Sequence, residues 1–221
     1  MTAVASPQQN VYPVSSQTRN RAAILLPIGP LIMLAGYVAM QGKGYDAQSW
    51  SVFFDLLSTP FLLITATIAA AASWRAAPRT SVVALTGLVC NIIGLAALHG
   101  MEAFQLVMEH SGTDKAALDS AFEAFATLPV GLLEIVLFLG GNLVGSAALL
   151  LAQFRTSTLP WHVPILSLVA VAADFTIPDS APPLVKSAGI SLFVAWSIAL
   201  AIAIRRPTQR APLRKRPPTT P

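Results

Sequence analysis

Residues 81–110 read SVVALTGLVCNIIGLAALHGMEAFQLVMEH, an apolar segment that continues without a break into one that carries histidine and glutamate. The apolar part ends near Leu98, and roughly 18 residues at about 1.5 Å each are just enough to cross a hydrocarbon core of about 30 Å. On a helix with about 100° between successive residues, the polar side chains share one face. They are Asn91, His99, Glu102, Glu109 and His110. The stretch therefore predicts a membrane span with a polar face.

The composition of the whole chain agrees with this interpretation. Its 221 residues are 54% hydrophobic and 11% charged, and the mean hydropathy is +0.64. Soluble domains usually contain about 25% charged residues, so this composition indicates an integral membrane protein. The single cysteine, Cys90, excludes an intrachain disulfide and a metal site built from several cysteines.

Six apolar segments have the length of membrane spans. The predicted spans are 22–40, 53–73, 81–98, 128–154, 162–177 and 184–204. Together they predict an all-α fold, a polytopic membrane domain of six transmembrane helices over residues 22–204. In the first span Pro27 and Pro30 each remove a backbone donor, which predicts a kink or a loose helix start.

Three segments lie outside these spans. Residues 112–126 have apolar side chains at helical spacing with acidic side chains away from them, which predicts a short amphipathic helix outside the membrane. The polar segment 1–21 is predicted to be a disordered tail, and the basic, proline-rich segment 205–221 a solvated tail.

Basic and acidic residues alternate between the two sides of the membrane. With six spans, both tails lie on one side, and that side holds 11 basic residues and no acidic one. They are Arg19, Arg21, Arg75, Arg79, Arg155, Arg205, Arg206, Arg210, Arg214, Lys215 and Arg216. The other side has three lysines and nine acidic residues. Because cytoplasmic loops carry the excess of Lys and Arg, we expect both termini in the cytoplasm of a plasma membrane.

Ionisable residues inside the spans lie at a common depth. Counted at about 1.5 Å per residue from the outer ends of their spans, Glu134 lies about 9 Å deep and Asp174 about 5 Å deep. Such residues are costly in hydrocarbon and mark functional sites or structural pairs. The candidates for an outward-facing polar pocket are His99, Glu102, Glu134, Asn142, Asp174 and Lys186.

Two interpretations of this pocket stay open. In the functional one it binds a divalent cation, relays protons or orients a polar head group. The metal ligands would be His99, Glu102, Glu134 and Asp174. In the structural one Glu134 is neutral or hydrogen-bonded, and Asp174 pairs with Lys186. In either case we expect Glu134 to face the bundle interior within reach of a polar neighbour. The candidate neighbours are His99, Asn142 and Lys186.

Small residues on the fourth span predict a close helix contact. Gly140, Gly141 and Gly145 favour packing within the bundle or a contact with another membrane protein. We interpret the basic C-terminal tail as a signal that fixes the orientation of the chain in the membrane. The alternative is contact with anionic lipid head groups. We expect no binding to nucleic acid.

The sequence contains no complete enzyme or cofactor motif, and a haem between His99 and His162 is excluded because these residues lie at opposite membrane surfaces. We therefore expect no cofactor and a non-enzymatic accessory or interaction protein. One alternative is a small transporter or channel with inverted three-span halves, because LPIG at 26–29 matches LPVG at 128–131. Another is a membrane enzyme or cation-binding protein that uses the His/Glu/Asp pocket.

The segments GMEAF at 100–104 and GISLFVAW at 189–196, in a chain of short Ala/Leu/Gly-rich spans, resemble a group of small multi-pass membrane proteins of high-GC bacteria. The resemblance covers most of residues 22–204. It implies a bacterial plasma membrane and no activity.

Overall fold

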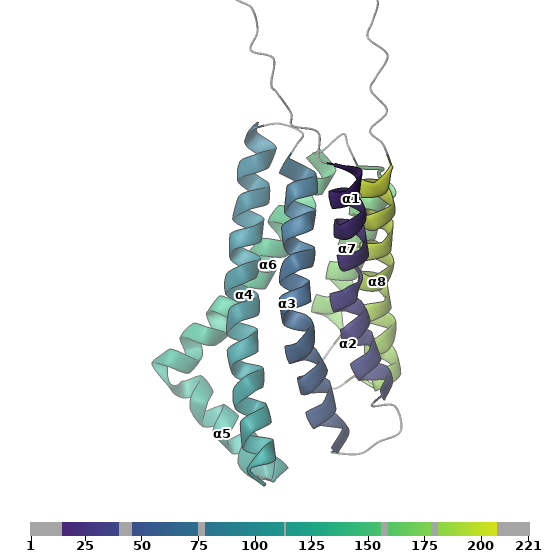
Figure 1. Ribbon diagram of the computed structural model, residues 1–221. Helices are drawn as coiled ribbons and strands as arrows, with labels where there is room; N and C mark the ends of the chain where they lie inside the picture. Colours follow the sequence, from purple (N-terminus) through teal and green to yellow (C-terminus); the bar gives the residue numbers. More distant parts are fainter. Residues whose placement is uncertain are drawn as a thin grey trace, which may run out of the picture.

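The computed structural model describes residues 15–39, 46–74, 78–112, 114–155, 159–177 and 181–206. These segments contain eight helices and no strand: α1 (Ser16–Leu25), α2 (Ile28–Ala39), α3 (Asp46–Trp74), α4 (Pro78–His110), α5 (Lys115–Thr127), α6 (Pro129–Arg155), α7 (His162–Thr176) and α8 (Pro183–Arg205). Figure 1 shows a bundle in which α5 turns back beside the end of α4. α1 begins and α8 ends at the same end of the bundle, called the tail end below; the opposite end is called the acidic end. Predicted tail residues 1–14 and 207–221 lie outside the described residues.

Most of these helices have the dimensions of membrane spans. Five segments of the described chain are long and apolar enough to cross a bilayer: Ser16–Ala39, Val52–Ser73, Ser81–Met108, Pro129–Arg155 and Leu184–Arg205. α7 has 15 residues, and at about 1.5 Å per residue it is shorter than a hydrocarbon core of about 30 Å. The predicted all-α polytopic bundle is confirmed, with α7 as a short member.

Two helices extend beyond their predicted ends. α1 begins at Ser16, inside the segment predicted to be disordered, and the Ser15 hydroxyl caps it by accepting a hydrogen bond from the Thr18 N–H at 3.1 Å. α4 continues to His110, and its membrane-length part reaches Met108 rather than ending at Leu98. The histidine and glutamate residues after Leu98 therefore belong to the same helix as the apolar segment.

The predicted break in the first span is a turn at Leu26 and Pro27, between α1 and α2. Pro30 has no N–H to donate to the carbonyl of Leu26, four residues earlier. The Thr65 hydroxyl on α3 lies 2.9 Å from that carbonyl and 2.9 Å from Phe61 O of its own helix, and its single proton is shared between the two acceptors. Because an unsatisfied carbonyl is costly in hydrocarbon, this hydrogen bond stabilises the break and anchors it to α3.

α4 and α6 cross in close contact at glycines. A Cβ atom at Gly141 would lie 2.7 Å from the backbone nitrogen of Gly94, and one at Gly87 would lie 2.8 Å from that of Leu149. A Cβ atom at Gly145 would overlap the side chain of Asn91. Of the two predicted alternatives, packing within the bundle accounts for Gly141 and Gly145, because α4 covers them. Gly140 alone of the three has open space beside it.

α5 is the amphipathic helix predicted at 112–126, although it begins at Lys115. The Asp114 carboxylate caps it by accepting a hydrogen bond from the Ala117 N–H at 2.8 Å. Leu118 is 3% exposed, and the Phe122 ring packs edge-on against Phe104 of α4 with ring centroids 5.8 Å apart. The apolar face of α5 is thus docked on the bundle.

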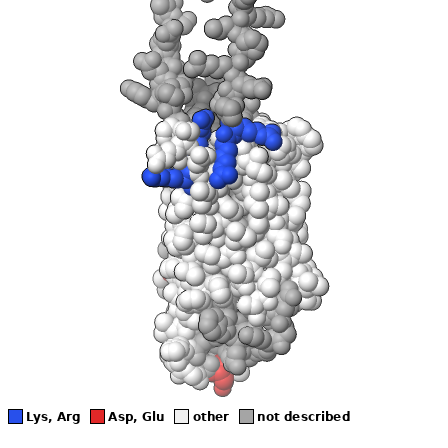
Figure 2. Space-filling model, turned by 45° about the vertical axis from the view of Figure 1, so that its right-hand side comes forward, with Lys and Arg blue, Asp and Glu red and all other residues white. Residues whose placement is uncertain are grey.

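The tail end of the bundle is filled by small and aliphatic side chains. One buried cluster joins α1, α3, α7 and α8 and contains Ala23, Leu26, Ala69, Val163, Trp196, Leu200 and Ala201. A second joins α3, α4 and α6 and contains Ala66, Ala70, Ala84, Leu149 and Ala152. Figure 2 shows Lys and Arg side chains gathered at this end of the visible face and an acidic side chain at the other end, in agreement with the predicted charge asymmetry.

Candidate functional site

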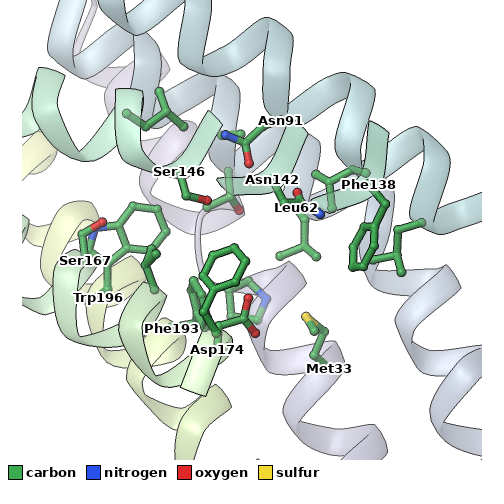
Figure 3. A pocket seen from close by; sticks show the side chains of 18 of the residues that line it. Met33, Leu62, Asn91, Phe138, Asn142, Ser146, Ser167, Asp174, Phe193 and Trp196 are labelled. Carbon is green, nitrogen blue, oxygen red and sulfur yellow. The ribbon is translucent and has the colours of Figure 1, made fainter. Parts of the chain in front are cut away.

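A cavity of about 240 Å³ lies among α2, α3, α4, α6, α7 and α8 (Figure 3). For comparison, an apolar cavity of about 150 Å³ in a protein core accommodates benzene. The cavity extends from Gln153 and Trp196, beside the two buried clusters of the tail end, to Asp174 near the acidic end of α7. Its size and position make it the candidate functional site.

The walls of the cavity are mostly apolar and include four aromatic side chains. These are Phe138, Phe175, Phe193 and Trp196. Trp196 is 8% exposed, and its indole N–H donates to Oε1 of Gln153 on α6 at 3.2 Å. Because this hydrogen bond holds the indole ring and joins α8 to α6, one aromatic wall of the cavity is fixed in place.

Some polar groups on the walls have no hydrogen-bond partner. Most hydroxyls of the spans donate to their own helix, as Ser73 does to Ala69 O at 2.9 Å and Ser197 to Val194 O at 2.8 Å. Ser167 on α7 is 6% exposed and lines the cavity, yet its hydroxyl makes no hydrogen bond to any described residue. Ser146 and Asn142 on α6 are in the same situation within the described chain. Burial of polar groups without partners is costly, so these three groups are available to a ligand.

Asn91 forms part of the wall on α4. Its amide nitrogen donates to Gly87 O at 2.9 Å, and the side chain is 8% exposed. The predicted polar face of α4 thus has one member in the cavity.

On the side of α6 and α7 the cavity reaches the surface of the bundle. Leu139 on α6 and Phe175 on α7 both line it, yet they are 50% and 44% exposed. The exposure of these two lining residues indicates that the cavity opens at the surface between α6 and α7.

Ionisable side chains from four helices form a charged cluster at the acidic end of the cavity. Asp55 of α3 lies within electrostatic range of Lys186 on α8 and of Asp174 on α7. Glu102 of α4 lies within electrostatic range of Asp55. The Asp55 Oδ1 and Glu102 Oε2 atoms are buried and have no hydrogen-bond partner among the described residues. Lys186 Nζ lies 5.8 Å from the centre of the Tyr37 ring on α2. This cluster, Asp55, Glu102, Asp174 and Lys186, contains three carboxyl groups and one lysine amine.

The structure brings together only some of the predicted pocket residues. Glu102, Asp174 and Lys186 belong to the charged cluster, and Asn142 lines the cavity. His99 is exposed on α4. Glu134 lies against Gly100 of α4, with its Oε1 3.8 Å from where a Cβ atom at Gly100 would be. Within the described residues it forms no hydrogen bond to His99, Asn142 or Lys186.

The predicted set of metal ligands is not assembled. Among the described residues there is no group of three or more His, Cys, Asp or Glu side chains that could hold a metal ion. His99 and Glu102 share one face of α4, about 60° apart, but His99 is exposed and Glu102 is only half-buried. The four proposed ligands, His99, Glu102, Glu134 and Asp174, therefore do not form one site in this structure.

Sequence reasoning did not select Asp55, Gln153, Ser167 or Trp196. Asp55 is two residues inside the predicted start of its span, where a carboxylate is expected to be solvated. Gln153 and Ser167 carry no charge, so nothing distinguished them from other polar residues of the spans. The sequence held one signal for Asp55. This residue lies near the start of its span, on the side of the membrane where other spans also end in acidic residues.

Comparison with protein-family models, with curated proteins and with solved structures finds no match. The fold and the apolar helices define the class of this chain, a multi-pass integral membrane protein built from α-helices.

Proposed function

We propose that the chain is a non-enzymatic membrane protein that binds a small amphiphilic molecule in the cavity between α6, α7 and the neighbouring helices. The observation that carries the proposal is Ser167, which is 6% exposed on the cavity wall and whose hydroxyl makes no hydrogen bond within the described chain. Hydroxyl and amide groups on an otherwise apolar wall match a ligand that has both polar and apolar parts.

An empty cavity leaves polar groups on its wall unsatisfied. In hydrocarbon an unsatisfied polar group is costly, and Ser146, Ser167 and Asn142 each contribute at least one such group. A ligand with a hydroxyl, an amide or an amine supplies the missing hydrogen bonds, while its apolar part fills space beside Phe193 and Trp196. Access from lipid between Leu139 and Phe175 suits a ligand that partitions into the bilayer.

Two observations favour binding over transport through a continuous passage. The buried clusters around Leu26, Leu149 and Leu200 fill the tail end of the bundle. The repeated LPxG segments also have different surroundings: a Cβ atom at Gly29 would meet Leu62 of α3, whereas one at Gly131 would meet Phe125 of the preceding helix. These contacts do not support equivalent halves.

We also propose that the tail end faces the cytoplasm of a cell membrane. Arg155 and Arg205, with Arg206 next to it, are exposed at this end, and Lys and Arg are enriched in cytoplasmic segments. Alkaline phosphatase fused after Arg206 is expected to be inactive, and active enzyme there would contradict this orientation.

A tryptophan-quenching measurement tests the binding proposal. One variant keeps Trp196 as its only tryptophan, and a matched variant keeps only Trp161, which is 75% exposed. Each is placed in lipid nanodiscs and titrated with bromoundecanol, a neutral amphiphile whose bromine quenches tryptophan on contact. We expect saturable quenching of Trp196 and a linear response of Trp161. A linear response of both would contradict a binding site in the cavity.

A pair of substitutions on α6 locates the site. Ser146→Leu adds bulk on the cavity wall, whereas Gly140→Leu adds the same side chain where nothing lies within 4 Å. We expect Ser146→Leu to weaken the saturable quenching of Trp196 and Gly140→Leu to leave it unchanged. Both variants must elute as a single species, so that misfolding does not explain the result. Equal loss of Trp196 quenching in the two variants would then mean that the probe binds outside the cavity.

A further inference from the structure

We infer that the cavity takes an uncharged amphiphile, such as a long-chain alcohol or ketone, and binds its polar group near the middle of the membrane. This inference rests on the proposed binding function and specifies the chemical class of the ligand and its direction in the cavity. It depends on the height of the polar groups of the wall, on their neutral character and on the position of the opening.

The polar groups of the wall lie at mid-height in their helices. Asn142 is the middle residue of the 27 residues of α6, and Ser146 follows one turn later. Ser167 lies within one turn of the middle of the 15 residues of α7. Asn142 Oδ1 also faces Gly94, in the middle of the membrane-length part of α4, where a Cβ atom would lie 2.9 Å from it. In a bilayer these groups are therefore far from both membrane surfaces.

These groups are neutral and can both donate and accept hydrogen bonds. Ser146, Ser167 and Asn142 make no hydrogen bond to any described residue, and Ser167 is 6% exposed. Asp174, the one ionisable residue among those that line the described cavity, already has an interaction partner in the chain. A charged ligand group would thus lie in hydrocarbon without a counter-ion, which is costly. A hydroxyl or carbonyl group instead supplies the missing hydrogen bonds without that cost.

The opening of the cavity sets the direction of the ligand. It lies between Leu139 on α6 and Phe175 on α7, which line the cavity and are 50% and 44% exposed. Both residues lie nearer the acidic end than Asn142 and Ser167 do, and Phe138 adds apolar surface beside the opening (Figure 3). The apolar chain of the ligand therefore lies toward the opening, and its polar group lies at the deeper end. A phospholipid does not fit this direction, because its charged head group stays at the membrane surface.

Four competitors with the same chain length test the inference. They are undecanol, undecane, undecanoate and undecyltrimethylammonium, each used in nanodiscs to displace bromoundecanol from the variant that keeps Trp196 as its only tryptophan. Recovery of Trp196 fluorescence gives the affinity of each competitor, expressed as its mole fraction in the lipid. We expect undecanol to bind about tenfold more tightly than each of the other three, because it alone is uncharged and forms hydrogen bonds.

The outcomes separate this inference from the binding function. Saturable quenching by bromoundecanol, with equal or tighter binding of a charged competitor or of undecane than of undecanol, would overturn the inference and leave the binding function in place. No saturable quenching by bromoundecanol would overturn both.

Removal of two wall hydroxyls identifies the groups responsible. In the double variant Ser146→Ala/Ser167→Ala we expect the preference for undecanol over undecane to fall from about tenfold to about twofold, while the affinity for undecane is unchanged. The matched control is Ser191→Ala/Ser197→Ala, which removes two hydroxyls that donate to carbonyls of α8 itself and is expected to keep the preference. A preference retained in Ser146→Ala/Ser167→Ala, or lost equally in the control, would contradict the assignment.

Discussion

The packed clusters and the cavity of this bundle use buried space in opposite ways. In the clusters, α1, α3, α7 and α8 pack through residues such as Ala69 and Leu200, and buried hydroxyls such as Ser197 bond to their own helix. On the cavity wall, Ser167 makes no hydrogen bond within the described chain, and carboxyl groups lie toward the acidic end. Close packing stabilises the clusters, while the cavity keeps polar groups that a ligand can use.

The largest effect is expected where packing is closest. In Gly87→Leu a side chain replaces a hydrogen against the backbone of Leu149, which a Cβ atom would approach to 2.8 Å. We expect a loss of about 3 kcal/mol in the free energy of unfolding, because α4 and α6 must separate. Thermal unfolding in detergent measures it.

Gly140→Leu is the control for this change, because the same side chain enters open space on α6. Its midpoint of unfolding is expected to match that of the parent protein. Equal destabilisation by Gly87→Leu and Gly140→Leu would mean that the glycines do not mark a close crossing.

A second prediction concerns the hydrogen bond at the break in the first span. Thr65→Val removes the hydroxyl that donates to Leu26 O, and because Pro30 cannot donate to this carbonyl it becomes unsatisfied. We expect a loss of about 2 kcal/mol. Thr67→Val is the matched control on the same helix, since the Thr67 hydroxyl is exposed and donates to Leu63 O of its own helix. A similar loss of stability in both variants would show that the contact across helices is unimportant.

The sequence was sufficient to predict the membrane domain, since apolar length alone identifies spans in a bilayer. It also indicated the acidic end and the residues Glu102, Asp174 and Lys186. It did not reveal which face of each helix is buried. Asn91 and Glu102 point inward while His99, within the same arc of α4, is exposed, because a helical wheel does not say where the neighbouring helices pack.

Predictions for α6 depended on tertiary contacts as well. Gly141 and Gly145 look equally suited to an internal and an external partner until their contact with α4 is known. The position of Glu134 follows from the crossing of α6 over α4, which places it against Gly100. The importance of Ser167 could not be predicted, because the absence of a hydrogen bond is a property of the packed bundle.

The contrast between the cavity wall and the packed interior is tested most directly by the reactivity of thiols placed at Ser167 and Ser197. Both residues are buried, at 6% and 0% exposure, but only Ser167 lines the cavity. Cys90 is first replaced by alanine, and each single-cysteine variant in nanodiscs is treated with methyl methanethiosulfonate, a small neutral reagent that partitions into lipid. We expect the thiol of Ser167→Cys to be modified, and to be protected by bromoundecanol, while that of Ser197→Cys stays unmodified. Equal rates at the two positions, or no reaction at Ser167→Cys, would contradict a cavity that is accessible from the bilayer.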